Sequence, residues 1–208
     1  MDIPANSLDN AERYALLTSA VVPRPIAWIT SADEVGVLNA APFSYFNVFD
    51  SSPPILGIGV GKRREGEDKD TLANIRAVGE FVVHIVNEAL TETMVKTAIP
   101  FPAGEGEVAA LDLATCPSSH VGVPRLKDAP VALECRTHQI VPLGSSTLVL
   151  GEVVSFYVQD GLIQEGKIDP RKLCAVGRLG GSFYTRTQDL FEDDRKSYEA
   201  WKAGKETG

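Results

Sequence analysis

The feature that most constrains the fold of this chain is a pair of long strand-like segments joined by a short polar turn. Residues 131–143 alternate loosely between apolar and polar side chains, and residues 147–159 form the clearest strand pattern in the sequence. Between them, Gly144-Ser145-Ser146 is short enough to close a hairpin. Strand and helix patterns elsewhere do not alternate regularly, which disfavours a doubly wound parallel sheet. We therefore predict a mainly β fold, an antiparallel barrel decorated with helices.

Shorter patterns fill the rest of the chain. Helices are expected over 9–19 with Asp9 as N-cap, over 70–78 with Asp70 as N-cap and Gly79 as the stop, and over 88–98 after Asn87. Strands are expected over 26–30, 37–42, 55–61 and 81–86. Residues 99–130 are long and irregular, and a connection of this kind is usually functional or packed over a neighbour. The charged tail from about residue 189 is expected to carry an exposed helix around 195–202.

Composition limits the class of protein. A chain of 208 residues with 44% hydrophobic residues fits one domain, and we assign 1–208 to it. Its net charge of -8 argues against nucleic acid as the main partner, because there is no basic excess to displace counterions. No apolar window reaches ~18 residues, so no membrane span is expected. The N-terminus does not read as a secretory signal, and the three cysteines form no disulfide framework, so we expect a cytoplasmic protein.

Residues 40–71 combine two kinds of ligand chemistry. The segment begins with the small apolar run that leads to Pro42-Phe43-Ser44, which could press a flat apolar ligand against backbone. It ends in a basic loop, and Asp70-Thr71 then begin the predicted helix, whose unpaired amides suit a phosphate. The basic residues of this loop are Lys62, Arg63, Arg64 and Lys69. An ordinary capped helix beside a solvated loop is the alternative reading.

Other motifs favour structural roles. The glycines Gly57 and Gly59 match two positions of a dinucleotide fingerprint, but they lie within a strand and not in the turn after one. They let either a side chain or a ligand lie close to the strand. His84 within an apolar strand is predicted to be a core histidine, and no metal site is expected. The sequence shows no nucleophile with a relay, so we name no catalytic residue.

Several segments, taken together and in order, resemble a known family. They are PRPIAW-x-T at 23–30, N-x-APFS-x-F-N at 39–47, KDT-x-x-NI at 69–75, GEFVV-x-x-V at 79–86, P-x-x-ECR at 130–136 and RLGG-x-x-Y at 178–184. This combination is similar to the flavin reductase-like family of FMN-binding split barrels. The family is related to flavoredoxin and to the reductase components of two-component monooxygenases.

The resemblance implies a Greek-key split barrel, a homodimer and one FMN per subunit. It places Thr30 and Ser31 along the ribityl-phosphate side and 41–44 at the isoalloxazine edge. Lys69 and Thr71 would hold the phosphate, and 178–184 would lie near the flavin or cover it. The full set of implied cofactor-binding residues is Thr30, Ser31, Asn39, Ala41, Pro42, Phe43, Ser44, Asn47, Arg63, Lys69, Asp70, Thr71, Arg178, Gly180 and Tyr184.

FMN carries redox chemistry by itself, so the absence of a visible nucleophile or base is consistent with this resemblance. The implied activity is that of an NAD(P)H-dependent flavin reductase, with NAD(P)H as a transient co-substrate and a monooxygenase or other redox protein as acceptor. One alternative is a flavoredoxin-like electron carrier that does not itself oxidise NAD(P)H. Another is a protein of the same fold without flavin. Residues 99–130 match no family motif. We expect this segment to determine which electron donor or acceptor the protein uses.

Overall fold

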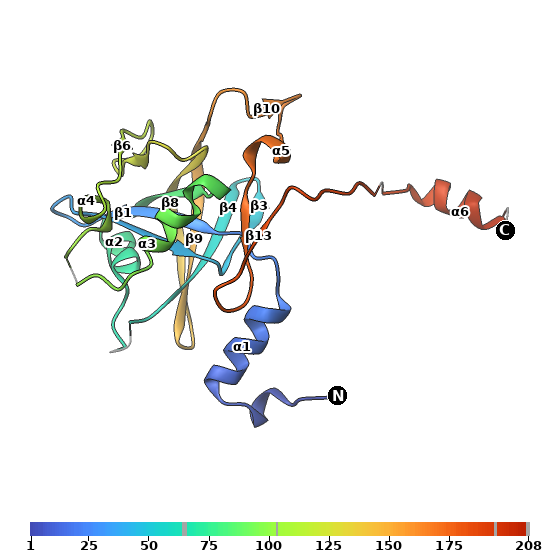
Figure 1. Ribbon diagram of the computed structural model, residues 1–208, viewed down its shortest axis with the longest axis horizontal. Coiled ribbons are helices and arrows are strands. Elements are labelled where there is room, and N and C mark those ends of the chain that lie inside the picture. Colours follow the sequence, from blue (N-terminus) through green and yellow to red (C-terminus); the bar gives the residue numbers. More distant parts are fainter. Residues whose placement is uncertain (64–65, 103, 194, 207–208) are drawn as a thin grey trace.

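The computed structural model describes residues 1–63, 66–102, 104–193 and 195–206. Its centre is a seven-stranded sheet with the strand order β2-β1-β5-β8-β9-β4-β3, in which all neighbours are antiparallel (Figure 1). The sheet is curved, because β2 also approaches β4 and side chains from both meet in one core. The predicted antiparallel barrel with helices is confirmed.

The sheet strands are β1 (Ala27–Ala32), β2 (Leu38–Phe43), β3 (Phe46–Ser51), β4 (Pro54–Gly61), β5 (Glu80–Ile85), β8 (Val131–Leu143) and β9 (Ser146–Val158). Shorter pairs are β6 (Thr115–Cys116) with β7 (Arg125–Leu126), β10 (Ile163–Gln164) with β11 (Lys167–Ile168), and β12 (Val176–Arg178) with β13 (Tyr184–Arg186). The helices are η1 (Ala5–Ser7), α1 (Asn10–Ala20), α2 (Asp70–Val78), η2 (Glu88–Leu90), α3 (Thr91–Lys96), α4 (Glu107–Ala110), α5 (Pro170–Leu173) and α6 (Tyr198–Glu206).

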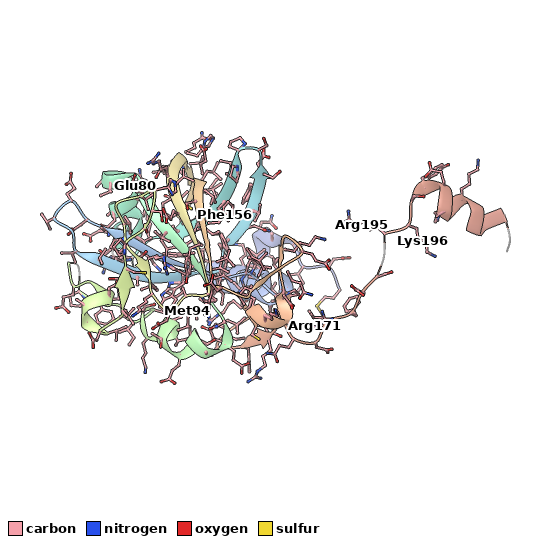
Figure 2. All side chains as sticks on the ribbon, turned by 90° about the horizontal axis from the view of Figure 1, so that it is seen from above. Glu80, Met94, Phe156, Arg171, Arg195 and Lys196 are labelled. Carbon is pink, nitrogen blue, oxygen red and sulfur yellow. The ribbon has the colours of Figure 1, made fainter. Side chains whose placement is uncertain are left out.

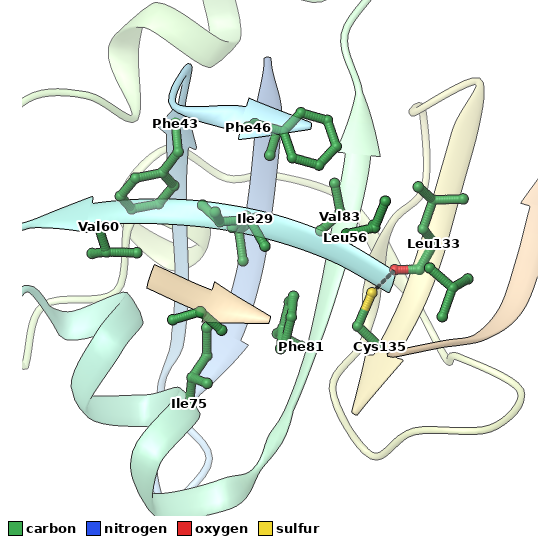
Figure 3. Packing of buried hydrophobic residues seen from close by; sticks show 14 of the residues in the cluster. Ile29, Phe43, Phe46, Leu56, Val60, Ile75, Phe81, Val83, Leu133 and Cys135 are labelled. Carbon is green, nitrogen blue, oxygen red and sulfur yellow. Dashed lines mark hydrogen bonds between the residues drawn. The ribbon is translucent and has the colours of Figure 1, made fainter. Parts of the chain in front are cut away.

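Side chains on both faces of β1 are buried, which explains its continuous apolar pattern. Ile29 faces the barrel core, where Ile75 of α2 and Phe81 of β5 also pack (Figure 3). Trp28, on the opposite face, packs in a second cluster with Met94 of α3. Its indole Nε1 donates to Thr97 Oγ1 over 3.0 Å, so the segment after α3 is fixed to the outside of the sheet.

Two helices follow their local sequence signals closely. Asp9 caps α1 in a capping box with Glu12, as predicted. The range predicted for α2 is also confirmed, and Gly79 ends it in the left-handed conformation with φ of 78°. The predicted N-cap of α2 is wrong, because Lys69 occupies that position and Asp70 is the first helical residue. The Asp70 carboxylate forms an ion pair with Arg63 instead of capping the helix.

Other boundaries differ where tertiary packing outweighs local pattern. Asn87 caps the turn η2, and α3 follows it, so the predicted 88–98 helix is divided. The irregular 99–130 segment contains α4, β6 and β7. The edge strand β3 was not predicted, since most of its residues are exposed and give no apolar alternation. The tail helix α6 begins later than expected and projects from the barrel, beyond Arg195 and Lys196 (Figures 1 and 2).

The strand glycines make room for side chains. A Cβ atom on Gly57 would lie 2.3 Å from the ring of Phe49, and one on Gly59 would lie 3.0 Å from Tyr45 Cβ. Of the two open readings, close approach of a side chain is therefore the one that the structure supports. In the described ranges, no helix has the length and apolar character needed to cross a bilayer.

His84 is a core histidine, as predicted. Its ring is fully buried, with Nδ1 2.8 Å from the Trp28 carbonyl oxygen and Nε2 accepting from the Leu126 amide over 2.9 Å. This arrangement requires the neutral ring protonated on Nδ1. Burial is the main reason why the pKa of His84 falls from 6.5 to about 4; the nearby charge of Arg125 also lowers it, while the bond to Trp28 opposes the change.

The lowered pKa of His84 predicts acid sensitivity. The unfolded chain binds a proton below about pH 6.5, whereas the folded chain resists doing so until about pH 4. The contribution of neutral His84 to the free energy of unfolding is therefore fully present above pH 6.5 and is lost as pH falls through 4. At about 1.4 kcal/mol per pKa unit, this contribution amounts to roughly 3 kcal/mol. In urea unfolding between pH 7 and 4, His84→Gln should show a shallower fall in the free energy of unfolding than wild type.

The control variant for this experiment is His138→Gln, at an exposed position of β8. Parallel curves for wild type and His84→Gln would contradict the assignment.

Candidate functional site

A cavity of about 540 Å³ lies between β2, the beginning of α2 and the segment from Thr97 to Glu107. Half-buried and buried backbone of β2 forms one wall, and the segment that follows α3 forms another. Many of the predicted site residues line this cavity: Asn39, Ala41, Pro42, Phe43, Arg63, Lys69, Asp70 and Thr71. Of the basic loop, Lys62 lines it too, while Arg64 lies outside the described residues.

One end of the cavity is cationic. Lys69 is the N-cap of α2, and the first-turn amides of Asp70 and Thr71 have no acceptor within the helix. The Lys69 ammonium lies 5.7 Å from the centre of the Phe43 ring, which brings the helix start against β2. Among the described side chains, no carboxylate lies within ion-pair distance of Lys69, whereas Arg63 is paired with Asp70. The lysine and the helix N-terminus therefore offer positive potential to an anion.

A chain of polar side chains joins three elements along the cavity wall. The Asn39 amide lies 2.9 Å from Thr71 Oγ1, and with its Nδ2 donating to Glu107 Oε2 over 2.8 Å its Oδ1 accepts the Thr71 hydroxyl. Glu107 Oε2 also accepts from the Ala40 amide over 2.9 Å. Thr71 is 1% exposed. Its hydroxyl therefore donates to Asn39, while the Thr71 backbone N–H has no acceptor within the helix.

Glu107 is a site residue that sequence reasoning missed. It is the first residue of α4, it is 6% exposed and it lines the cavity. Burial raises the pKa of its carboxyl, and the charge of Asp70 adds to this, while the bond from Ala40 and the charge of Arg63 oppose it. A single glutamate inside an irregular segment carries no periodic signal, so only the three-dimensional contact with Ala40 identifies it.

The main cavity adjoins a smaller one along an apolar part of its wall. Pro42, Phe43 and Ala98 line both cavities, and the second has a volume of about 170 Å³. Three further predicted site residues line this second cavity: Ser44, Arg178 and Tyr184. The Arg178 guanidinium lies 4.5 Å from the centre of the Tyr184 ring. The structure thus brings Arg178 and Tyr184 close to Pro42 and Phe43, the β2 residues that also line the main cavity.

Four predicted residues line neither cavity. Thr30 and Ser31 are fully buried; Thr30 Oγ1 donates to the Pro124 carbonyl oxygen over 2.9 Å, and Ser31 Oγ accepts from Asn74 over 3.2 Å. Asn47 is exposed on β3, and Gly180 lies against Ser19 of α1.

The arrangement combines positive potential with an apolar wall in one cavity. Within the described residues, the main cavity has no histidine, cysteine or serine on its walls. Its polar groups are placed to bind and orient: Lys69 and the helix amides at one end, and Asn39 held by Glu107 along the side. The geometry therefore supports cofactor binding through charge and shape.

Comparison with known proteins agrees with this geometry. An uncharacterized protein of Halalkalibacterium halodurans is 41% identical over 94% of this chain and 96% of its own length. The crystal structure of nitrilotriacetate monooxygenase component B from Bacillus cereus matches with a TM-score of 0.89 and 36% identity, covering 92% of this chain and 98% of that one. The 2-nitrobenzoate 2-nitroreductase NbaA of Pseudomonas fluorescens matches with a TM-score of 0.87 and 36% identity, covering 95% and 98%. The family model for the flavin reductase like domain matches residues 19–175, and this chain belongs to that family.

Proposed function

We propose that this protein is an NAD(P)H-dependent flavin reductase that binds one FMN per subunit in the main cavity. The observation that carries the proposal is the combination of charge and apolar surface on the walls of that cavity. Lys69 and the first turn of α2 supply positive potential, and Pro42 and Phe43 of β2 supply an apolar wall close to it. Membership of the flavin reductase-like family makes a flavin the natural ligand for such a cavity.

The residues present fit FMN. Lys69 and the amides of Asp70 and Thr71 would hold the phosphate, because a charge-assisted bond and a helix N-terminus both favour an anion. Pro42 and Phe43 would lie against the ring system. Asn39 is fixed by Thr71 and Glu107, so its position does not depend on the ligand. The site is thereby organised before the flavin arrives.

FMN, when bound, supplies the redox chemistry by taking up electrons from NAD(P)H and passing them to an acceptor. The residues of the chain bind and orient it. One of the similar structures is component B of a monooxygenase system, which supports a monooxygenase or another redox protein as the acceptor of this chain. A flavoredoxin-like carrier, which holds FMN and takes electrons from a protein, is the alternative.

The first experiment separates reductase from carrier. Purified protein is mixed with NADH or NADPH and free FMN, and oxidation is followed at the nicotinamide absorption band. We expect steady oxidation that depends on protein and on FMN. A bound flavin that neither nucleotide reduces would support the carrier, and a colourless protein that leaves added FMN fluorescence unchanged would contradict both.

The second experiment tests the phosphate anchor. Lys69→Ala should raise the Kd for FMN on the order of 10- to 100-fold, because a charge-assisted hydrogen bond contributes roughly 1.5–3 kcal/mol. Riboflavin lacks the phosphate, so its Kd should change little. Fluorescence titration of both flavins provides the measurement.

Lys96→Ala is the matched control for the phosphate experiment, because Lys96 is an exposed lysine of α3 paired with Glu92. It should leave both affinities unchanged. An equal loss of FMN and riboflavin in Lys69→Ala would show that Lys69 does not contact the phosphate and that the proposed orientation is wrong.

The third experiment tests the homodimer. Apolar side chains are exposed on α1, where Leu17 is 58% exposed, and on the edge strand β3, where Val48 is 65% exposed. An unpaired edge strand with apolar residues favours association. We expect a dimer in sedimentation equilibrium at micromolar concentration, weakened by Val48→Lys but not by Val35→Lys in the exposed hairpin turn. A wild-type monomer would refute the proposed assembly.

A further inference from the structure

The smaller cavity has a chemistry of its own. Its floor is apolar, with Ile26 and Met94 both buried, and Tyr14 and Tyr184 lie on its walls. Its volume of about 170 Å³ suits a compound with a single ring, because pockets for larger organic ligands run to roughly 300–1,000 Å³. It adjoins the main cavity through Pro42 and Phe43, so a ligand here would lie beside the β2 wall of the larger site.

Two arginines on its walls are held together by backbone pairing. The Arg24 amide donates to the Arg178 carbonyl oxygen over 2.9 Å, and the Arg178 amide donates back over 2.8 Å. This bridge joins the segment before β1 to the end of β12, and it fixes both side chains relative to one cavity.

Neither guanidinium has a counter-ion among the described residues. Arg24 is 7% exposed, and it donates to the carbonyl oxygens of Thr18, Val21 and Leu179. The Arg178 side chain donates to the Gly181 carbonyl oxygen and stacks on the ring of Tyr184. No carboxylate of the described residues lies within 4.0 Å of either group. Ion pairs within that distance occur elsewhere in the chain but do not include these two arginines.

Carbonyl groups satisfy the donors of a guanidinium without neutralising its charge. The buried Arg24 and the half-exposed Arg178 both give the cavity positive potential, and an arginine binds carboxylates through paired hydrogen bonds. Aromatic walls then favour a flat apolar body attached to that anion. A phosphate-bearing dinucleotide exceeds the volume available, which leaves a small ring with a carboxylate group.

We propose that this second cavity binds a small aromatic carboxylate, with its carboxylate toward Arg178 and its ring against Tyr184 and Phe43. Arg24, whose donors are committed to three carbonyl groups and to Ser44 Oγ, adds positive potential. The site itself rests on the arginines and the cavity. Its use for a co-substrate that exchanges electrons with a flavin in the neighbouring cavity rests on the proposed function.

Isothermal titration of the flavin-free protein with benzoate, and with neutral benzamide of similar shape, tests the site directly. We expect benzoate to bind at least about tenfold more tightly than benzamide, because only benzoate forms a charge-assisted pair. Arg178→Gln should weaken benzoate by about tenfold or more and leave benzamide unchanged. Arg186→Gln is the control, because Arg186 lies on the partner strand β13 and pairs with Glu88 at the surface.

Several results would overturn the proposal: no heat with benzoate up to millimolar concentration, equal affinity for the two ligands, or unchanged benzoate affinity in a folded Arg178→Gln protein. The comparison of the two ligands on wild type needs no variant, so a poorly folded variant does not decide the outcome. Repeating the titration with added FMN separates the two proposals. Benzoate binding without any FMN binding would support this site and reject the flavin proposal.

Discussion

The carboxylate of Glu107 holds the edge strand β2 in place, and the main cavity depends on this contact. As the end strand of the sheet order, β2 has an outer edge whose amides find no partner strand. Glu107 accepts the hydrogen bond of Ala40, and the Asn39 amide links the same carboxylate to Thr71 at the start of α2. Three segments far apart in sequence are thereby fixed around one space. The cost is a buried acid, and that burial raises the pKa of Glu107.

Local signals determined those parts of the fold whose neighbours lie close in sequence. The long β8–β9 hairpin and the range of α2 were predictable, because alternation, a helical apolar face and the left-handed Gly79 act within a few residues. The N-cap of α2 was not, because Asp70 resembles a capping residue but pairs with Arg63 across the loop. The edge strand β3 also escaped prediction, since it has little buried surface to impose a period.

The segments around the main cavity could be named from the sequence because of their order along the chain. Asn39, Lys69 and Thr71 belong to segments whose order resembles a family, and the structure gathers them on one cavity. Thr30 and Ser31 have the same kind of resemblance, yet their side chains are used inside the protein by Pro124 and Asn74. Glu107 could be found only from the three-dimensional structure. Its role comes from a hydrogen bond to Ala40, which is far from it in the sequence. Order along the chain thus identifies segments, while tertiary contacts decide which side chains line a cavity.

The wall between the two cavities shows how the sequence avoids an unpaired donor there. On an edge strand, the amides of residues two apart point the same way, so the direction of the Ala40 amide fixes that of position 42. Proline has no amide proton, and its place at 42 removes the next outward donor. Beyond it, Phe43 fills the barrel core and also lines both cavities. The wall is therefore apolar and free of an unsatisfied amide at position 42, so this part of the edge strand needs no hydrogen-bond acceptor from a neighbouring segment or a ligand.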